Sequence, residues 1–183
     1  MKTPENNQKK RIVFREGRTI DLCILNHERH FEKCLKFINN QPITRYMLVG
    51  NFPIHFNQEE KWFDGLGKDD KNIVFAVETK AGKYLGNGGL HKIDYISRNA
   101  EIGLFIGCPN EQGKGYGTEA ERLIANYAFS IGLKKVYGSI FSDNIASLKA
   151  AEKNGCEIEG KLKKHIFKNG QWHDVVLIAF IMQ

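Results

Sequence analysis

The sequence predicts an α+β fold in which a mixed, mostly antiparallel sheet carries helices on both faces. Residues 72–78 and 98–107 are apolar and rich in β-branched side chains, which is typical of buried strands. Downstream, apolar residues recur at the spacing of one helical face, namely at Ala120, Leu123, Ile124, Tyr127, Ala128 and Ile131. Asn169-Gly170 separates two further apolar segments and is a strong signal for a two-residue hairpin.

The first seventy residues give weaker patterns. Residues 1–10 are polar and are expected to be a disordered tail, with a single domain over residues 11–183. Residues 11–15 and 18–25 predict a strand pair around a turn at Glu16-Gly17. Residues 27–39 predict a helix that buries one apolar face, made of Phe31, Cys34, Leu35 and Ile38.

Between that helix and the first apolar strand, the pattern is broken. Asn39-Asn40-Gln41-Pro42 ends the helix, and residues 43–56 predict a loop or broken helix because they contain Pro53 and no sustained period. Asn57 is the N-cap candidate of a short helix that runs to Leu66 and carries acidic residues in its first turn.

The second half predicts its elements in a clear order. Residues 84–95 form a strand interrupted by glycines, and residues 135–141 form another strand. A helix capped by Asp143 or Asn144 then ends near Asn154-Gly155. The strands of the final hairpin span residues 157–167 and 171–181.

Length and composition point to one ordinary globular domain. The 183 residues have a mass of 20.9 kDa and a hydrophobic content of 42%, enough for a full core. No apolar run approaches the roughly 20 residues of a membrane span. The basic, polar N-terminus also lacks the apolar stretch of a signal peptide. We therefore expect a cytoplasmic protein with no membrane partner.

Cysteine and histidine spacing gives no sign of a metal site. The four cysteines are scattered without a C-x-x-C pair. His27 and His30 are three residues apart, whereas a metalloprotease helix needs histidines four residues apart. We expect neither a metal nor a disulfide framework.

The formal net charge of +6 raises the question of nucleic-acid binding. The basic residues are spread along the chain, with local groups at Lys9-Lys10-Arg11 and in 161–168, and no aromatic-rich RNA-binding motif accompanies them. We expect no nucleic-acid partner. A ligand with several phosphate charges is itself a sufficient reason for a basic surface.

A glycine-rich loop organises the chain, with a predicted strand before it and a predicted helix after it. Its residues are Gln112, Gly113, Lys114, Gly115, Tyr116, Gly117 and Thr118. Glycines at such a junction let backbone N–H groups and the positive helix end approach an anion, most simply a phosphate or pyrophosphate. The spacing fits neither a Walker loop nor a dinucleotide fingerprint. It fits the pattern Q-x-x-G-x-G, formed by Gln112, Gly115 and Gly117.

This loop resembles the pyrophosphate loop of the GNAT superfamily of acetyl-CoA-dependent N-acetyltransferases. Further matches follow in order at Thr118-Glu119-Ala120, 144–147, 152–156, Glu159-Gly160 and 169–174. Together they cover about residues 71–181 and are similar to the branch with ribosomal-protein N-terminal acetyltransferases and polyamine acetyltransferases. The resemblance implies a sheet that splays between the strand before the loop and the strand ending at Phe141, with the acyl group in that gap.

The resemblance also implies an acetyl-CoA site. Backbone N–H groups of 113–118 would hold the pyrophosphate, and main-chain groups of Phe105, Ile106 and Gly107 would meet the pantetheine arm. Asn144 would contact the pantetheine or acetyl region, although Asn is also a good N-cap. Ser147 and Lys153 are further candidates, for the arm and for the adenosine 3′-phosphate.

Acetyl transfer to an amine also needs a proton acceptor, because an alkylamine has a pKa of about 10. Glu101 is the candidate, since related enzymes often place an acid there. Strand alternation predicts that Glu101 shares a face with Gly103 and Phe105. Its role stays open between general base and a structural or substrate-orienting carboxylate.

Two positions depart from the family pattern. A tyrosine that protonates the leaving thiolate in many relatives is replaced by Ala151, and a glutamate that serves as base in protein N-terminal acetylators is replaced by Ser139. A thiol with a pKa of about 8.5 leaves without an acid, so activity is still expected.

The expected acceptor is a small-molecule amine, such as a polyamine, amino sugar or amino acid derivative. Its contacts should come from the poorly matched segments, where the candidates are Tyr46, Phe56, Trp62 and Trp172. Alternatives are acetylation of a protein N-terminus and a catalytically weak acetyl-CoA sensor. A homodimer is compatible with the sequence.

Overall fold

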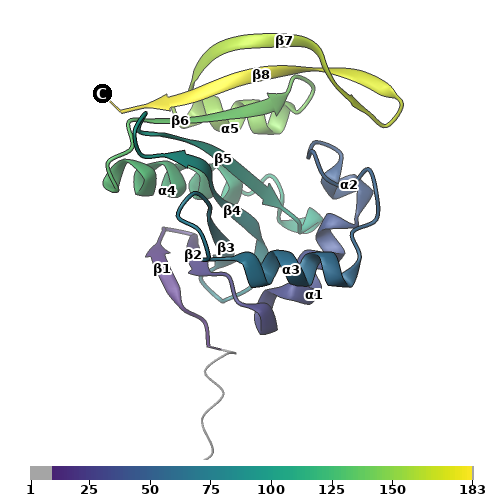
Figure 1. Ribbon diagram of the computed structural model, residues 1–183, viewed down its shortest axis with the longest axis vertical. Coiled ribbons are helices and arrows are strands. Elements are labelled where there is room, and N and C mark those ends of the chain that lie inside the picture. The colour runs from purple at the N-terminus through teal and green to yellow at the C-terminus, as the bar shows by residue number, and fades with distance from the viewer. Residues whose placement is uncertain (1–9, 183) are drawn as a thin grey trace, which may run out of the picture.

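The computed structural model describes residues 10–182, and it confirms the predicted α+β architecture (Figure 1). The described strands form one eight-stranded sheet in the order β1-β2-β3-β4-β5-β6-β8-β7. Every neighbouring pair is antiparallel except β5 and β6, which are parallel. Apart from Lys10, the predicted tail lies outside the described residues.

The strands are β1 (Val13–Glu16), β2 (Ile20–Ile24), β3 (Ile73–Thr79), β4 (Tyr84–Asp94), β5 (Asn99–Ile106), β6 (Lys135–Phe141), β7 (Glu157–Lys168) and β8 (Gln171–Ile181). The helices are α1 (His27–Ile38), α2 (Gln41–Thr44), α3 (Phe56–Gly65), α4 (Tyr116–Ser130) and α5 (Ile145–Lys153), with a 3-10 turn, η2, at Pro109–Glu111. No helix in this described part of the chain is long and apolar enough to cross a membrane.

Helices cover both faces of the sheet, as Figure 1 shows for α4 and α5 on one side and α1 and α3 on the other. On the α4 face, Ile124 and Ala128 are fully buried in a cluster with Leu90 and Val136 of the sheet. On the α1 face, a second cluster joins both helices to β2, β3 and β4, through residues that include Phe31, Cys34, Phe63, Ala76 and Tyr84.

Several predicted boundaries are wrong in detail. Helix α3 begins two residues early, with His55 as its N-cap. The backbone N–H of His55 donates to Gln58 Oε1 at 2.9 Å, and Asn57 already lies inside the helix. Ile131 is the C-cap of α4 and is 37% exposed, so it lies beyond the buried face. The strand predicted at 84–95 runs to Asp94 as β4, and its pairing with β3 shifts register beside Gly86.

The sheet divides between β5 and β6. These strands pair only from Asn99–Glu101 to Lys135–Tyr137. Beyond that point β6 stays with β8 along its whole length and β5 stays with β4 as far as Ile106, so residues 102–106 and 138–141 face each other without pairing. We call the space between these two unpaired edges the gap; it confirms the predicted splay.

Candidate active site

The two faces of β5 meet different surroundings beside the gap. Ile102, Leu104 and Ile106 pack against the cluster under α4, whereas Phe105 packs against the cluster under α1. Side chains alternate along a strand, so Glu101 and Gly103 also lie on the α1 face, as the sequence predicted. The register of β4 and β5 shifts between His91 and Asp94, and Lys92 has a φ of 50°. The irregularity therefore belongs to β4, and β5 keeps its alternation.

The glycine loop lies between the end of β5 and the start of α4. Gly113 and Gly115 have φ of 77° and 86°, which suits glycine, and a Cβ at either position would meet nothing within 4 Å. Residues 112–115 are exposed, and Gly115 is the N-cap of the 15-residue helix α4. Backbone N–H groups at this helix end form a concave, positive site that fits a phosphate group.

Two lysines flank the loop and share one acid. Glu111 Oε1 lies 2.5 Å from Lys83 Nζ, and its Oε2 lies 2.8 Å from Lys114 Nζ. These ion pairs lower the pKa of Glu111 below its ordinary value. Both lysine side chains are about half exposed (50% and 52%), and the three groups together leave one net positive charge beside the loop.

Part of the main chain before the loop is already hydrogen-bonded. The N–H of Gly107 donates to Leu85 O at 2.7 Å, and Gln112 Nε2 donates to Ile106 O at 2.9 Å. Hydrogen-bond directions alternate along an antiparallel pair. The main-chain groups of Phe105 therefore also point toward β4, while the N–H groups of Leu104 and Ile106 point into the gap.

Gly107 is a glycine for a reason that sequence reasoning missed. A Cβ at this position would lie 2.2 Å from Cδ2 of Phe37 on α1. The end of α1 therefore packs directly on the backbone that leads into the glycine loop.

Helix α5 begins at the far edge of the gap, just after β6. Asn144 is its N-cap, and the N–H of Ser147 donates to Asn144 Oδ1 at 3.3 Å. Lys153 is exposed in the last turn. Ala151 is 2% exposed and packs with Ile140, so the position of the family's tyrosine faces the core beneath α5.

Glu101 lies at the closed end of the gap. Its Oε2 is 2.7 Å from Lys92 Nζ, and its side chain is 25% exposed. His91 is its register partner on β4, and Tyr137 is its partner on β6. Sequence analysis missed His91; its signal was a single imidazole two positions after Gly89, next to Leu90 in the predicted strand.

The four aromatic residues predicted to contact the acceptor do not come together. Tyr46 alone reaches the end of β6, where its hydroxyl donates to Asp143 O at 3.2 Å. Phe56 packs on Phe31 in the α1 layer. The other two pack on local neighbours: Trp62 on Phe63, and Trp172 on Phe167 at the hairpin tip.

The tip of the β7–β8 hairpin is nevertheless hydrogen-bonded to the segment that follows α2. Lys168 Nζ is buried and donates to the carbonyls of Met47 and Val49 at 2.5 and 2.7 Å. His173 Nδ1 lies 3.4 Å from Asp143 Oδ2. Together with Tyr46, these contacts enclose the end of β6 from the α1 face.

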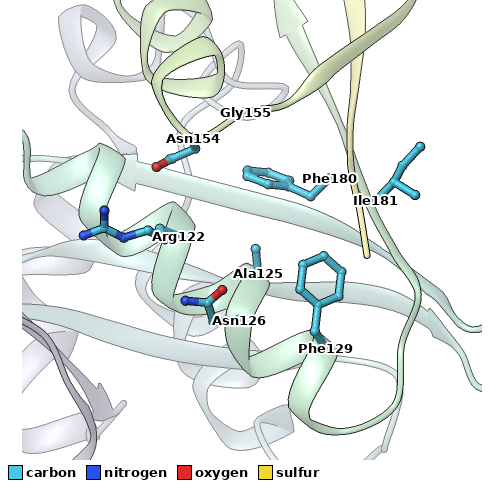
Figure 2. A pocket seen from close by; sticks show the side chains of 8 residues that line it. All are labelled: Arg122, Ala125, Asn126, Phe129, Asn154, Gly155, Phe180 and Ile181. Atoms are coloured by element: carbon cyan, nitrogen blue, oxygen red, sulfur yellow. The ribbon is translucent and has the colours of Figure 1, made fainter. Parts of the chain in front are cut away.

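A shallow hollow of about 140 Å³ lies beside the second half of α4, as Figure 2 shows. Arg122, Asn126 and Phe129 of α4 line one side, and Phe180 of β8 lines the other. None of its lining residues is a predicted site residue, and the hollow lies away from the helix end that carries the glycine loop. Within the described residues, no group of three or more His, Cys, Asp or Glu side chains is placed to hold a metal.

Comparison with known proteins gives one consistent family. A family model described as "Acetyltransferase (GNAT) domain" matches residues 22–157. The spermidine N(1)-acetyltransferase of Escherichia coli (strain K12) is 30% identical over 139 residues, covering 75% of this chain and 73% of that protein. The uncharacterized N-acetyltransferase YnaD of Bacillus subtilis (strain 168) is 35% identical over 174 residues, covering 94% of each.

Among solved structures, the spermidine N-acetyltransferase from Vibrio cholerae in complex with CoA and spermine is similar throughout. Its TM-score is 0.80 at 26% sequence identity, and the match covers 89% of this chain and 95% of that chain.

Proposed function

Since the chain belongs to the GNAT family and is an acetyl-CoA-dependent N-acetyltransferase, we propose that its acceptor is the primary amine of a small molecule. Polyamines are the first class to test, because similar proteins from Escherichia coli and Vibrio cholerae are named for spermidine. The observation that carries the proposal is the separation of β5 from β6 beside the glycine loop.

The acetyl-CoA site extends from this loop into the gap. The N–H groups of residues 113–118 bind the pyrophosphate, supported by the open positive-φ glycines and the end of α4. The N–H groups of Leu104 and Ile106 meet the pantetheine arm and the thioester carbonyl, since that of Gly107 is bonded to Leu85. Across the gap, Asn144 and Ser147 line the arm.

The acceptor approaches from the α1 face, opposite α4. Glu101 and Asp143 supply negative charge there, and Tyr46 lies beside Asp143. The Lys92 side chain is 74% exposed, so it can move aside when a cationic amine approaches Glu101. In this arrangement Glu101 orients the amine next to the thioester.

Two alternatives remain as outcomes of the test. A protein N-terminus is disfavoured because Ser139, exposed on the gap edge of β6, replaces the glutamate base of such enzymes. A catalytically weak sensor is suggested by Ala151, but a thiol with a pKa of about 8.5 needs no acid in order to leave.

The experiment measures acetyl-CoA binding by calorimetry and thiol release with a panel of amines. The panel contains spermidine, spermine, a monoamine, an amino sugar, an amino acid amide and a peptide with a free N-terminus. Turnover that is highest with a small amine supports the proposal. Highest turnover with the peptide supports the N-terminal alternative, and binding without thiol release from any member supports the sensor.

A further inference from the structure

The imidazole of His91 lies over β5 at the start of the gap. A Cβ built on Gly103 would lie 3.1 Å from His91 Nε2 and 3.2 Å from its Cδ2. The ring therefore lies on the α1 face of Gly103, two residues beyond the last pairing of β5 with β6 at Glu101. Because Gly103 has no side chain, the imidazole occupies that space and faces the gap.

Hydrogen bonds fix which nitrogen of His91 carries the proton. Asn72 Nδ2 donates to both carboxylate oxygens of Asp69 at 3.2 Å, which turns Asn72 Oδ1 toward His91. His91 Nδ1 lies 3.3 Å from that oxygen and therefore donates to it. In the neutral ring Nε2 then keeps its lone pair, and no hydrogen bond to Nε2 is present within residues 10–182.

The surroundings keep this ring neutral near pH 7. Burial lowers the pKa of His91 below its ordinary value; Glu101 acts in the opposite direction, and Lys92 adds to the lowering. Asp69 acts only through Asn72, since the amide separates its carboxylate from the ring. The result is an oriented, unprotonated nitrogen at the gap.

Other candidate bases are less suitable. Glu101 is ion-paired with Lys92 at 2.7 Å, and in the proposed function the cationic amine takes the place of Lys92, so a cation neighbours this carboxylate in both states. His173 has Nε2 3.3 Å from Lys168 O, and its Nδ1 faces Asp143, so both of its nitrogens are engaged. If the parallel register of Glu101 with Tyr137 is continued, Ser139 lies across the gap from Gly103. His91 thus supplies a basic group opposite Ser139.

The geometry points to His91 Nε2 as the proton acceptor of the reaction, held in place by Asn72 and Asp69 as positioning residues. This inference rests on the proposed function. The neutral amine, having lost one proton to water, attacks the thioester carbonyl carbon and forms the C–N bond. The nitrogen, now acidic, gives a proton to Nε2 as the C–S bond breaks and the thiolate leaves. His91 then passes this proton to solvent or to the thiolate, giving the amide and free CoA thiol.

The test compares the wild-type protein with His91→Gln, using the panel amine with the highest wild-type turnover. Gln retains a donor for Asn72 but accepts no proton in this pH range. We expect kcat to fall by about 10²- to 10³-fold and the slope of the acidic limb of the kcat/KM profile to decrease, leaving only the ionisation of the amine itself. Acetyl-CoA affinity and melting temperature should stay unchanged. His27→Gln, an exposed histidine on α1, is the matched control and should keep full activity.

Asn72→Ala tests the positioning role, and we expect kcat to fall by about tenfold with a shifted acidic limb. Wild-type turnover and an unshifted limb in His91→Gln would overturn the inference while leaving the proposed function intact. A wild-type protein that releases no thiol with any amine would instead overturn the proposed function. ¹⁵N NMR of the imidazole gives a readout independent of turnover: a proton on Nε2 rather than Nδ1 at pH 7 would contradict the assigned geometry.

Discussion

His30 Nε2 lies 2.7 Å from the carboxylate of Glu78, and both side chains are buried between α1 and β3. The N–H of Asn26 donates to His30 Nδ1 at 2.8 Å, so in the neutral ring Nε2 carries the proton that Glu78 accepts. Arg29 and Arg11 also donate to Glu78. Burial alone would raise the pKa of Glu78, but these hydrogen bonds lower it to about 2.

The first prediction concerns stability at low pH. Because the folded-state pKa of Glu78 lies below its ordinary value of 4.5, its contribution to stability is complete above pH 4.5 and is lost as the pH falls toward 2. Glu78→Gln should lower the free energy of unfolding at pH 7 by about 3 kcal/mol and flatten its pH dependence in that window. Urea unfolding between pH 2 and 7 measures both effects. Glu157→Gln, an exposed carboxylate on β7, is the control; equal pH slopes in wild type and Glu78→Gln would contradict the prediction.

The second prediction concerns the glycine loop. Gly115→Glu places a carboxylate beside the proposed pyrophosphate site, and acetyl-CoA affinity should fall at least about tenfold, or about 1.4 kcal/mol. Because Gly115 has a φ of 86°, any side chain there also adds backbone strain. Gly115→Ala is therefore the matched control and should weaken binding less. Calorimetry measures both variants, and unchanged affinity in Gly115→Glu would place the phosphate site elsewhere.

The third prediction concerns sulfur chemistry. Burial raises the pKa of Cys108, and its Sγ lies 3.5 Å from Tyr84 O, so the thiol stays protonated near neutral pH. Direct transfer needs no acyl-enzyme intermediate, and Cys108→Ala should keep most of the turnover. Mass spectrometry of rapidly quenched reactions provides the decisive measurement. An acetylated Cys108 that forms and decays at the rate of turnover would refute direct transfer.

The fourth prediction separates Glu101 from His91. If Glu101 orients the cationic amine, Glu101→Gln should raise the KM for the amine by about tenfold, about the strength of one charge-assisted hydrogen bond. The acidic limb of the pH–rate profile should stay in place, since its titrating group remains. Steady-state kinetics from pH 5 to 9 test this. A decreased slope of that limb in Glu101→Gln, but not in His91→Gln, would make Glu101 the base.

The fifth prediction concerns the contact between α1 and the start of the loop. Gly107→Ala brings a Cβ within 2.2 Å of the Phe37 ring, and it should destabilise the fold by about 1–3 kcal/mol. Adding Phe37→Leu should recover part of the loss, because the smaller side chain leaves room for the methyl group. Gly160→Ala is the control, since its Cβ would meet only Leu177 Cδ1, at 4.0 Å. Additive losses in the double variant would show that Phe37 is not the cause.

Local patterns predicted most elements because local interactions decide them. Strand β6 spans 135–141 as predicted, and Asn169 and Gly170 have φ of 50° and 80°, as the two-residue hairpin requires. The Asn57 cap was wrong because a competing cap two residues earlier, His55, pairs with Gln58 and starts the helix at Phe56.

The sequence by itself determined the family and the order of strand, glycine loop and helix, and it supplied the candidate acetyl-CoA residues, because these depend on motifs that are continuous along the chain. Only the tertiary structure decided which groups meet across strands. In the folded protein the N–H of Gly107 donates to Leu85 O, Ala151 is buried beneath α5, and the ring of His91 lies over Gly103. Such contacts depend on strand register and on side-chain direction between segments distant in sequence, which no local period encodes.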